Sequence, residues 1–97
     1  MKRKSNENSV SELIELFMNQ YGLGKKYGEF KLLQAWSIMM GPMIANRTTD
    51  LRIVNDVLIV QLSSASLKSE LSYAKTKIVE RLNEAAGKVV IQDIIFQ

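Results

Sequence analysis

Residues 51–62, Leu-Arg-Ile-Val-Asn-Asp-Val-Leu-Ile-Val-Gln-Leu, decide the fold class of this chain of 97 residues. Apolar and polar residues alternate on either side of Asn55 and Asp56, two residue types that tolerate positive φ in tight turns. The stretch therefore predicts a β-hairpin. Its second arm is apolar on both faces, because Leu58, Val60 and Leu62 alternate with Val57 and Ile59.

Helical spacing predicts the segments before the hairpin. Ser9 and Glu12 have the spacing of a capping box, and apolar residues follow every three or four positions up to Tyr21. Gly22 is expected to end this first helix, and residues 22–28 are expected to form a loop. A second helix is predicted over residues 29–40, followed by a short one over residues 42–46 that begins at Pro42.

A third helix and a last strand are predicted after the hairpin. Apolar residues from Leu67 to Ala85 form one stripe over five turns, and Gly87 is expected to cap that helix. Residues 89–96 are rich in β-branched side chains and predict a strand. The element order is α-α-(short α)-β-β-α-β, which favours an α+β fold with a three-stranded sheet and helices on one of its faces. Residues 1–8 are expected to be a flexible basic leader, and residues 9–97 a single domain.

The chain contains no histidine and no cysteine. It therefore lacks the commonest general base at neutral pH, and it cannot build a Cys- or His-ligated metal site. The carboxylates are dispersed, and the glycines near Lys25 do not have the spacing of a phosphate-binding loop. We expect a binding protein rather than an enzyme, with no catalytic residue, no metal and no cofactor.

The net charge of +3 comes mainly from the first eight residues. They hold three of the thirteen basic residues and one of the ten acidic ones, so residues 9–97 are nearly neutral. Scattered surface charge is one interpretation of the remaining basic residues, and a nucleic-acid-binding patch is the other. The candidates for such a patch are Lys25, Lys26, Arg47, Arg52, Lys68 and Lys75. Lys68 and Lys75 are seven residues apart and are expected to share one helix face.

The second face of the sheet is a candidate surface for a protein partner. Apolar side chains of the hairpin and of the last strand are expected to line up there, namely Val57, Ile59, Ile91 and Ile95. The alternative is that the first helix packs over them. The last strand is also a candidate free edge. Trp36 is expected in the core, with an exposed stacking platform as the alternative.

No apolar run approaches the roughly 18–20 residues that a membrane-spanning helix needs. The basic start is followed by polar residues rather than by the apolar stretch of a signal peptide. We therefore expect a cytoplasmic protein without a membrane partner.

Three stretches of the chain carry a family resemblance. They are the helix end from Trp36 to Gly41, the strand Leu58-x-Val60-x-Leu62 followed by two serines, and the closing Ile94-x-Phe96. In order and spacing they resemble the DciA family of bacterial proteins over about residues 10–97. The resemblance implies a KH-like domain that acts with the replicative DNA helicase, helps to load it on single-stranded DNA, and also binds DNA. The chain lacks the Gly-x-x-Gly loop of nucleic-acid-binding KH domains, so we expect weak, salt-sensitive DNA binding.

Two other functions stay open from the sequence. One is a protein-interaction module without nucleic-acid contact, suggested by the apolar sheet face and the nearly neutral body. The other is a KH-like adaptor that binds RNA, suggested by the fold alone. A homodimer is compatible with all of these functions.

Overall fold

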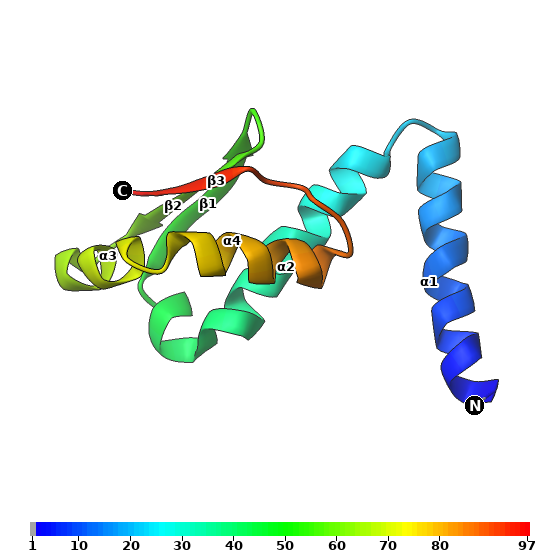
Figure 1. The fold of residues 1–97 in the computed structure, drawn as a ribbon, viewed down its shortest axis with the longest axis horizontal. Coiled ribbons are helices and arrows are strands. Elements are labelled where there is room, and N and C mark those ends of the chain that lie inside the picture. Colours follow the sequence, from blue (N-terminus) through cyan, green and yellow to red (C-terminus); the bar gives the residue numbers. More distant parts are fainter. Residues whose placement is uncertain (1) are drawn as a thin grey trace.

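The hairpin forms where the alternating pattern predicts it. The computed structural model describes the backbone of residues 2–97 and the side chains of residues 10–97. The elements in chain order are α1 (Lys2–Gln20), α2 (Gly24–Ala45), β1 (Thr48–Val54), β2 (Val57–Leu62), α3 (Ala65–Ser72), α4 (Lys75–Ala86) and β3 (Asp93–Phe96). The fold is α+β, as predicted, and its order is α-α-β-β-α-α-β (Figure 1).

The sheet has three strands in the order β1-β2-β3. β1 and β2 are antiparallel and β2 and β3 are parallel, so the sheet is mixed as expected. Asn55 and Asp56 both have positive φ, 51° and 66°, which matches the twist of a two-residue hairpin turn. Because β3 returns beside β2, the hairpin provides the central strand and one edge strand.

The core lies between one face of the sheet and the helices α2 and α4 (Figure 1). Leu58 and Val60 of β2 are fully buried there, as is Trp36 of α2. The indole Nε1 of Trp36 donates to Oγ1 of Thr48 over 3.1 Å, and its ring lies 6.4 Å from that of Phe96. The expectation that Trp36 packs in the core is confirmed, and a role as an exposed stacking platform is excluded.

The first two helices begin earlier than predicted. α1 begins at Lys2, so Ser9 does not cap it, while Gly22 follows its end with φ of +73° as expected. The flexible leader over residues 1–8 stays a prediction, because Met1 and the side chains of residues 2–9 lie outside the described part of the chain. The loop expected over residues 22–28 is wrong, since α2 already begins at Gly24.

Two glycines explain the early start of α2. Gly24 and Gly28 are four residues apart on one side of the helix, and both are buried. A Cβ atom on Gly28 would lie 2.7 Å from Cε of Lys88 and 3.2 Å from Cγ2 of Val90. The glycines thus let another segment of the chain lie against the backbone of α2, and this packing compensates for their poor helix propensity. Gly41 interrupts the helix as predicted, with φ of 85° and ψ of 168°, immediately before Pro42.

The single long helix predicted from Leu67 to Ala85 is wrong. α3 ends at Ser72, and α4 begins at Lys75 after the non-helical Ala74 (φ −112°, ψ 16°). The hydroxyl of Ser72 donates to the carbonyl of Lys68, a contact that competes with the regular helix pattern. Of these two helices, only α4 contributes buried side chains, namely Ile78, Leu82 and Ala86.

The last strand is shorter than the predicted residues 89–96, because Asn83 takes the place of a neighbouring strand. Oδ1 of Asn83 accepts from the amides of Val90 and Ile91 at 2.8 and 3.1 Å. Its Nδ2 donates to the carbonyl of Ile91 at 3.0 Å. The amides of Val90 and Ile91 and the carbonyl of Ile91 thus have partners without sheet pairing, and β3 begins only at Asp93. The KH-like assignment and the single-domain boundary stay predictions.

Candidate functional site

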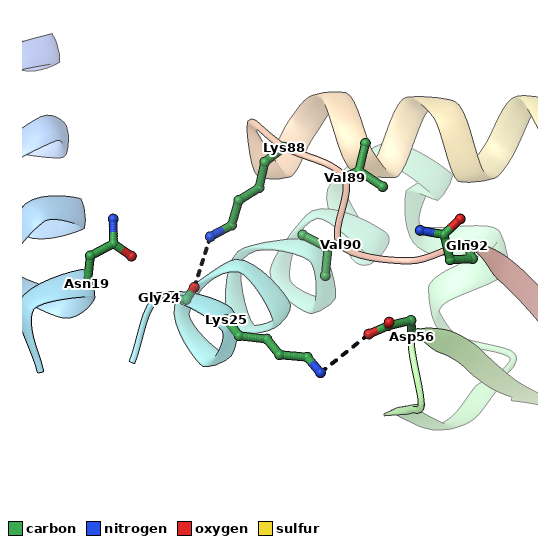
Figure 2. Close-up of a pocket in the computed structure, with 8 residues that line it drawn as sticks. All are labelled: Asn19, Gly24, Lys25, Asp56, Lys88, Val89, Val90 and Gln92. Atoms are coloured by element: carbon green, nitrogen blue, oxygen red, sulfur yellow. Dashed lines mark hydrogen bonds and ion pairs between the residues drawn. The ribbon is translucent and has the colours of Figure 1, made fainter. Parts of the chain in front are cut away.

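A cleft of about 330 Å³ opens where α2 begins (Figure 2). It is built from four parts of the chain: the end of α1, the start of α2, the hairpin turn and the segment between α4 and β3. The residues that line it are Asn19, Gly24, Lys25, Asp56, Lys88, Val89, Val90 and Gln92. Residues far apart in the sequence therefore meet at one place on the surface.

Two lysines give this cleft its charge. Nζ of Lys88 donates to the carbonyl of Gly24 over 3.0 Å, and Nζ of Lys25 lies 3.5 Å from Oδ1 of Asp56 (Figure 2). The Lys25–Asp56 pair is exposed, with 69% and 45% of the two side chains accessible. An exposed pair of this kind contributes at most about 1 kcal/mol, so an incoming phosphate can replace the carboxylate of Asp56 as the partner of Lys25 at little cost.

The start of α2 adds to the positive potential of the cleft. No side chain caps this helix end, and the amides of a first helical turn carry a partial positive charge. Lys25 lies in this turn, and Lys88 contacts it. The arrangement suits an anionic ligand such as the phosphate backbone of a nucleic acid.

The six basic residues predicted for nucleic acid do not form one patch. Lys25 lies in the cleft, whereas Lys26 lines a separate apolar groove between α1 and α2. Arg47 lies at the opposite end of the sheet from the hairpin turn, where its carbonyl accepts from the amide of Ser63. Arg52 lies on the open face of the sheet, 2.7 Å from the carboxylate of Asp50.

Lys68 and Lys75 do not share a helix face. Lys68 lies on α3 and Lys75 begins α4, so the break between the two helices removes the expected seven-residue spacing. Lys68 lies on α3, which follows the end of β2, and this is the same end of the sheet as Arg47. The predicted basic residues thus lie at several separate places on the surface.

Lys88 is the charged residue of the cleft that the sequence pattern missed. It follows the Gly87 cap and looks like one more solvated lysine after a helix. One signal in the sequence could have indicated it. Gly24 and Gly28 are four residues apart, and two glycines at this spacing mark a side of a helix that another segment of the chain can approach closely. Asn19 and Gln92 were missed for the same reason, since only the tertiary fold brings them to the cleft.

The second face of the sheet is open and partly apolar. Ile59 of β2 lies between Arg52 of β1 and Ile95 of β3 in the strand register. Ile95 is 42% exposed, and Val54, which pairs with Val57, is 45% exposed. Three of the four residues predicted for this surface are therefore on it. Ile91 is not, because it is 1% exposed in the core beside Asn83.

No described helix covers this face. α2 and α4 pack on the opposite side of the sheet, and α1 stands beside the start of α2, away from the strands (Figure 1). The alternative that the first helix packs over the sheet is therefore not what the structure has. β3 pairs with β2 alone and forms an edge of the sheet, as predicted for the last strand.

Among the described side chains, those of residues 10–97, no group of three or more from Asp, Glu, His or Cys is placed to hold a metal ion. In the same part of the chain, no helix is both long enough and apolar enough to cross a membrane. The described surface therefore offers a basic cleft and an open sheet face as its candidate sites.

Comparison with known protein families shows a match over nearly the whole chain. The family model described as "Dna[CI] antecedent, DciA" matches residues 9–96, nearly the whole chain. No curated protein and no solved structure matches the chain significantly.

Proposed function

Because the chain belongs to the DciA family, we propose that it is a non-enzymatic accessory factor of DNA replication that binds the replicative helicase and single-stranded DNA. Family membership supports a role of the helicase-loader kind, and the members of this family are accessory factors rather than enzymes. The match over residues 9–96 is the single observation that carries the proposal. In this proposal the basic cleft binds DNA and the open sheet face binds the helicase.

The basic cleft is our candidate for single-stranded DNA. Lys25 lies in the first turn of α2, Lys88 reaches the same turn from the segment after α4, and the exposed Lys25–Asp56 pair is weak and exchangeable. The other charged residues of the domain are basic and acidic in nearly equal number, which favours a small number of phosphate contacts and weak DNA binding. Each contact to a single strand lowers the slope of log K against log salt concentration by about 0.7.

The DNA test is fluorescence anisotropy with a labelled single strand at low and at moderate salt. Replacement of both Lys25 and Lys88 by Ala is expected to weaken binding by about tenfold and to flatten the salt slope by about 1.4. Lys68→Ala, at the other end of the sheet, is the matched control and is expected to change little. Unchanged affinity after the double replacement would remove the cleft from the proposal. RNA strands of the same sequence, used as competitors, distinguish the RNA-adaptor alternative.

The open sheet face is our candidate for the helicase. Ile59 and Ile95 are neighbours across β2 and β3, and neither belongs to the core. Ile59→Glu with Ile95→Glu is expected to abolish capture of the replicative helicase by the immobilised chain while DNA binding persists. Thr49→Glu, an exposed β1 position, is the control for the added charge. The proposed function fails if the unaltered chain captures no helicase and binds no DNA at either salt concentration.

An interaction module without nucleic-acid contact is the second candidate. The open apolar face and the nearly neutral body favour it. Helicase capture without any DNA binding would select it.

A further inference from the structure

α1 turns its apolar side away from the rest of the molecule. Val10, Ile14, Phe17 and Tyr21 follow one another at intervals of four, three and four, which places them on one stripe of the helix. Their exposed fractions are 57%, 40%, 57% and 64%. An amphipathic helix normally turns such a stripe toward its own core, so this orientation needs an explanation.

The opposite side of α1 faces the body of the protein. Glu15 and Met18 are half-buried, and the side chain of Asn19 lies against Gly24 at the start of α2. Figure 1 shows α1 standing beside the start of α2 and extending away from the sheet. The apolar stripe therefore lies on an outer surface of the chain.

An apolar groove lies between α1 and α2, near the end of α1 where the stripe finishes. Met18, Leu23, Tyr27 and Phe30 line this groove, with Lys26 at its side. Leu23 is 42% exposed and Phe30 is 56% exposed. Among the described side chains of α1, those from Val10 onward, no charged one lies between the apolar residues of the stripe, and Lys26 at the side of the groove is exposed.

We propose that a second copy of this chain covers this surface, with α1 of each copy packed on the stripe and the groove of the other across a two-fold axis. A two-fold interface uses the same patch on both copies, and this patch offers both a projecting helix and a groove to receive it. This patch, the outer stripe, consists of the stripe itself, the exposed leucines beside it on α1, and two residues of the groove: Val10, Leu13, Ile14, Leu16, Phe17, Tyr21, Leu23 and Phe30.

The size of the outer stripe matches what a stable dimer needs. These eight residues are between 40% and 64% exposed. The three aromatic side chains present on the order of 150–250 Å² each when fully accessible and the five aliphatic ones on the order of 100 Å² each, so the stripe offers roughly 600 Å² per copy. Stable specific interfaces bury about 600–1,000 Å² on each partner, and homodimer interfaces are more apolar than the average surface.

Such a dimer leaves both candidate sites accessible. Asn19, the residue of α1 that lines the basic cleft, lies on the side of the helix away from the stripe. The open sheet face lies apart from α1 altogether (Figure 1). The dimer would present two copies of each site, and its formation does not depend on the proposed function.

The test is light scattering coupled to size exclusion, over a hundredfold range of concentration into the high micromolar region. The unaltered chain of 11.0 kDa is expected to reach twice that mass as concentration rises. Phe17→Glu is expected to raise the dissociation constant at least a hundredfold and to give a monomer throughout. Because Phe17 lies outside the core, the fluorescence of the buried Trp36 is expected to stay unchanged and to show that the domain remains folded.

Ile38→Glu is the matched control. Ile38 is 84% exposed on α2 and does not belong to the outer stripe, so the same charge there is expected to leave the dimer intact. A monomer at the highest concentration of the unaltered chain would overturn the proposal, as would a dimer that survives Phe17→Glu. A monomeric chain that loses helicase capture through Phe17→Glu would overturn it as well, and would assign the stripe to the helicase.

Discussion

Asn83→Ala is the substitution that tests most directly how this fold is held together. The side chain of Asn83 makes three hydrogen bonds to the backbone of Val90 and Ile91, between 2.8 and 3.1 Å long. Val90 and Ile91 are 8% and 1% exposed, so water cannot easily replace the lost partner. Alanine keeps the helix propensity high, and the effect of the substitution is therefore the loss of these bonds.

The expected magnitude follows from the number of bonds. A typical hydrogen bond contributes about 0.5–1.5 kcal/mol net, and a buried group left without a partner costs about 1–3 kcal/mol. Three bonds to one segment, with some relaxation, give a loss of about 2–4 kcal/mol in the free energy of unfolding. For a domain of this size, each kcal/mol corresponds to roughly 4–8 °C in Tm.

Urea unfolding followed by Trp36 fluorescence is the appropriate assay, because Trp36 is the only tryptophan and is fully buried. Asn83→Asp keeps the oxygen acceptor and loses the Nδ2 donor. Its free energy of unfolding is therefore expected to lie between that of Asn83→Ala and that of the unaltered chain. Glu84→Ala, an exposed neighbour on α4, is the control and is expected to change stability by less than about 0.5 kcal/mol. A loss below about 1 kcal/mol for Asn83→Ala would refute the argument that this side chain substitutes for a strand.

Two further predictions concern α2. Gly41→Ala is expected to lower the free energy of unfolding by about 1–3 kcal/mol, because φ of 85° with ψ of 168° is a region occupied almost only by glycine. The loss comes from the backbone and not from crowding, since no atom lies within 4 Å of the added Cβ. Thermal unfolding measures it, with Ser37→Ala as the control, and an unchanged Tm would contradict it. Trp36→Phe is expected to cost about 2 kcal/mol through the lost hydrogen bond to Thr48 and the space left in the core. Circular dichroism during urea unfolding measures this loss, and stability equal to that of the unaltered chain would contradict it.

Local patterns in the sequence were sufficient for the hairpin, for the helix ends at Gly22 and Gly87, for the interruption at Gly41, and for the presence of a last strand but not for its start. In each case the deciding physics lies within a few residues: side-chain alternation, or a backbone angle that glycine or asparagine adopts easily. The α+β class followed from these elements. The absence of histidine and cysteine, which argued for a binding protein, is likewise a property of composition alone.

The tertiary structure alone decided which residues meet. The start of α2 at Gly24, the break at Ala74 and the late start of β3 depend on contacts with segments distant in the sequence. For the same reason, the cleft contains Lys88, the six predicted basic residues are divided, and Ile91 is in the core. Periodicity identifies the apolar side of a helix but not what covers it. Only the fold showed that the apolar side of α1 faces outward.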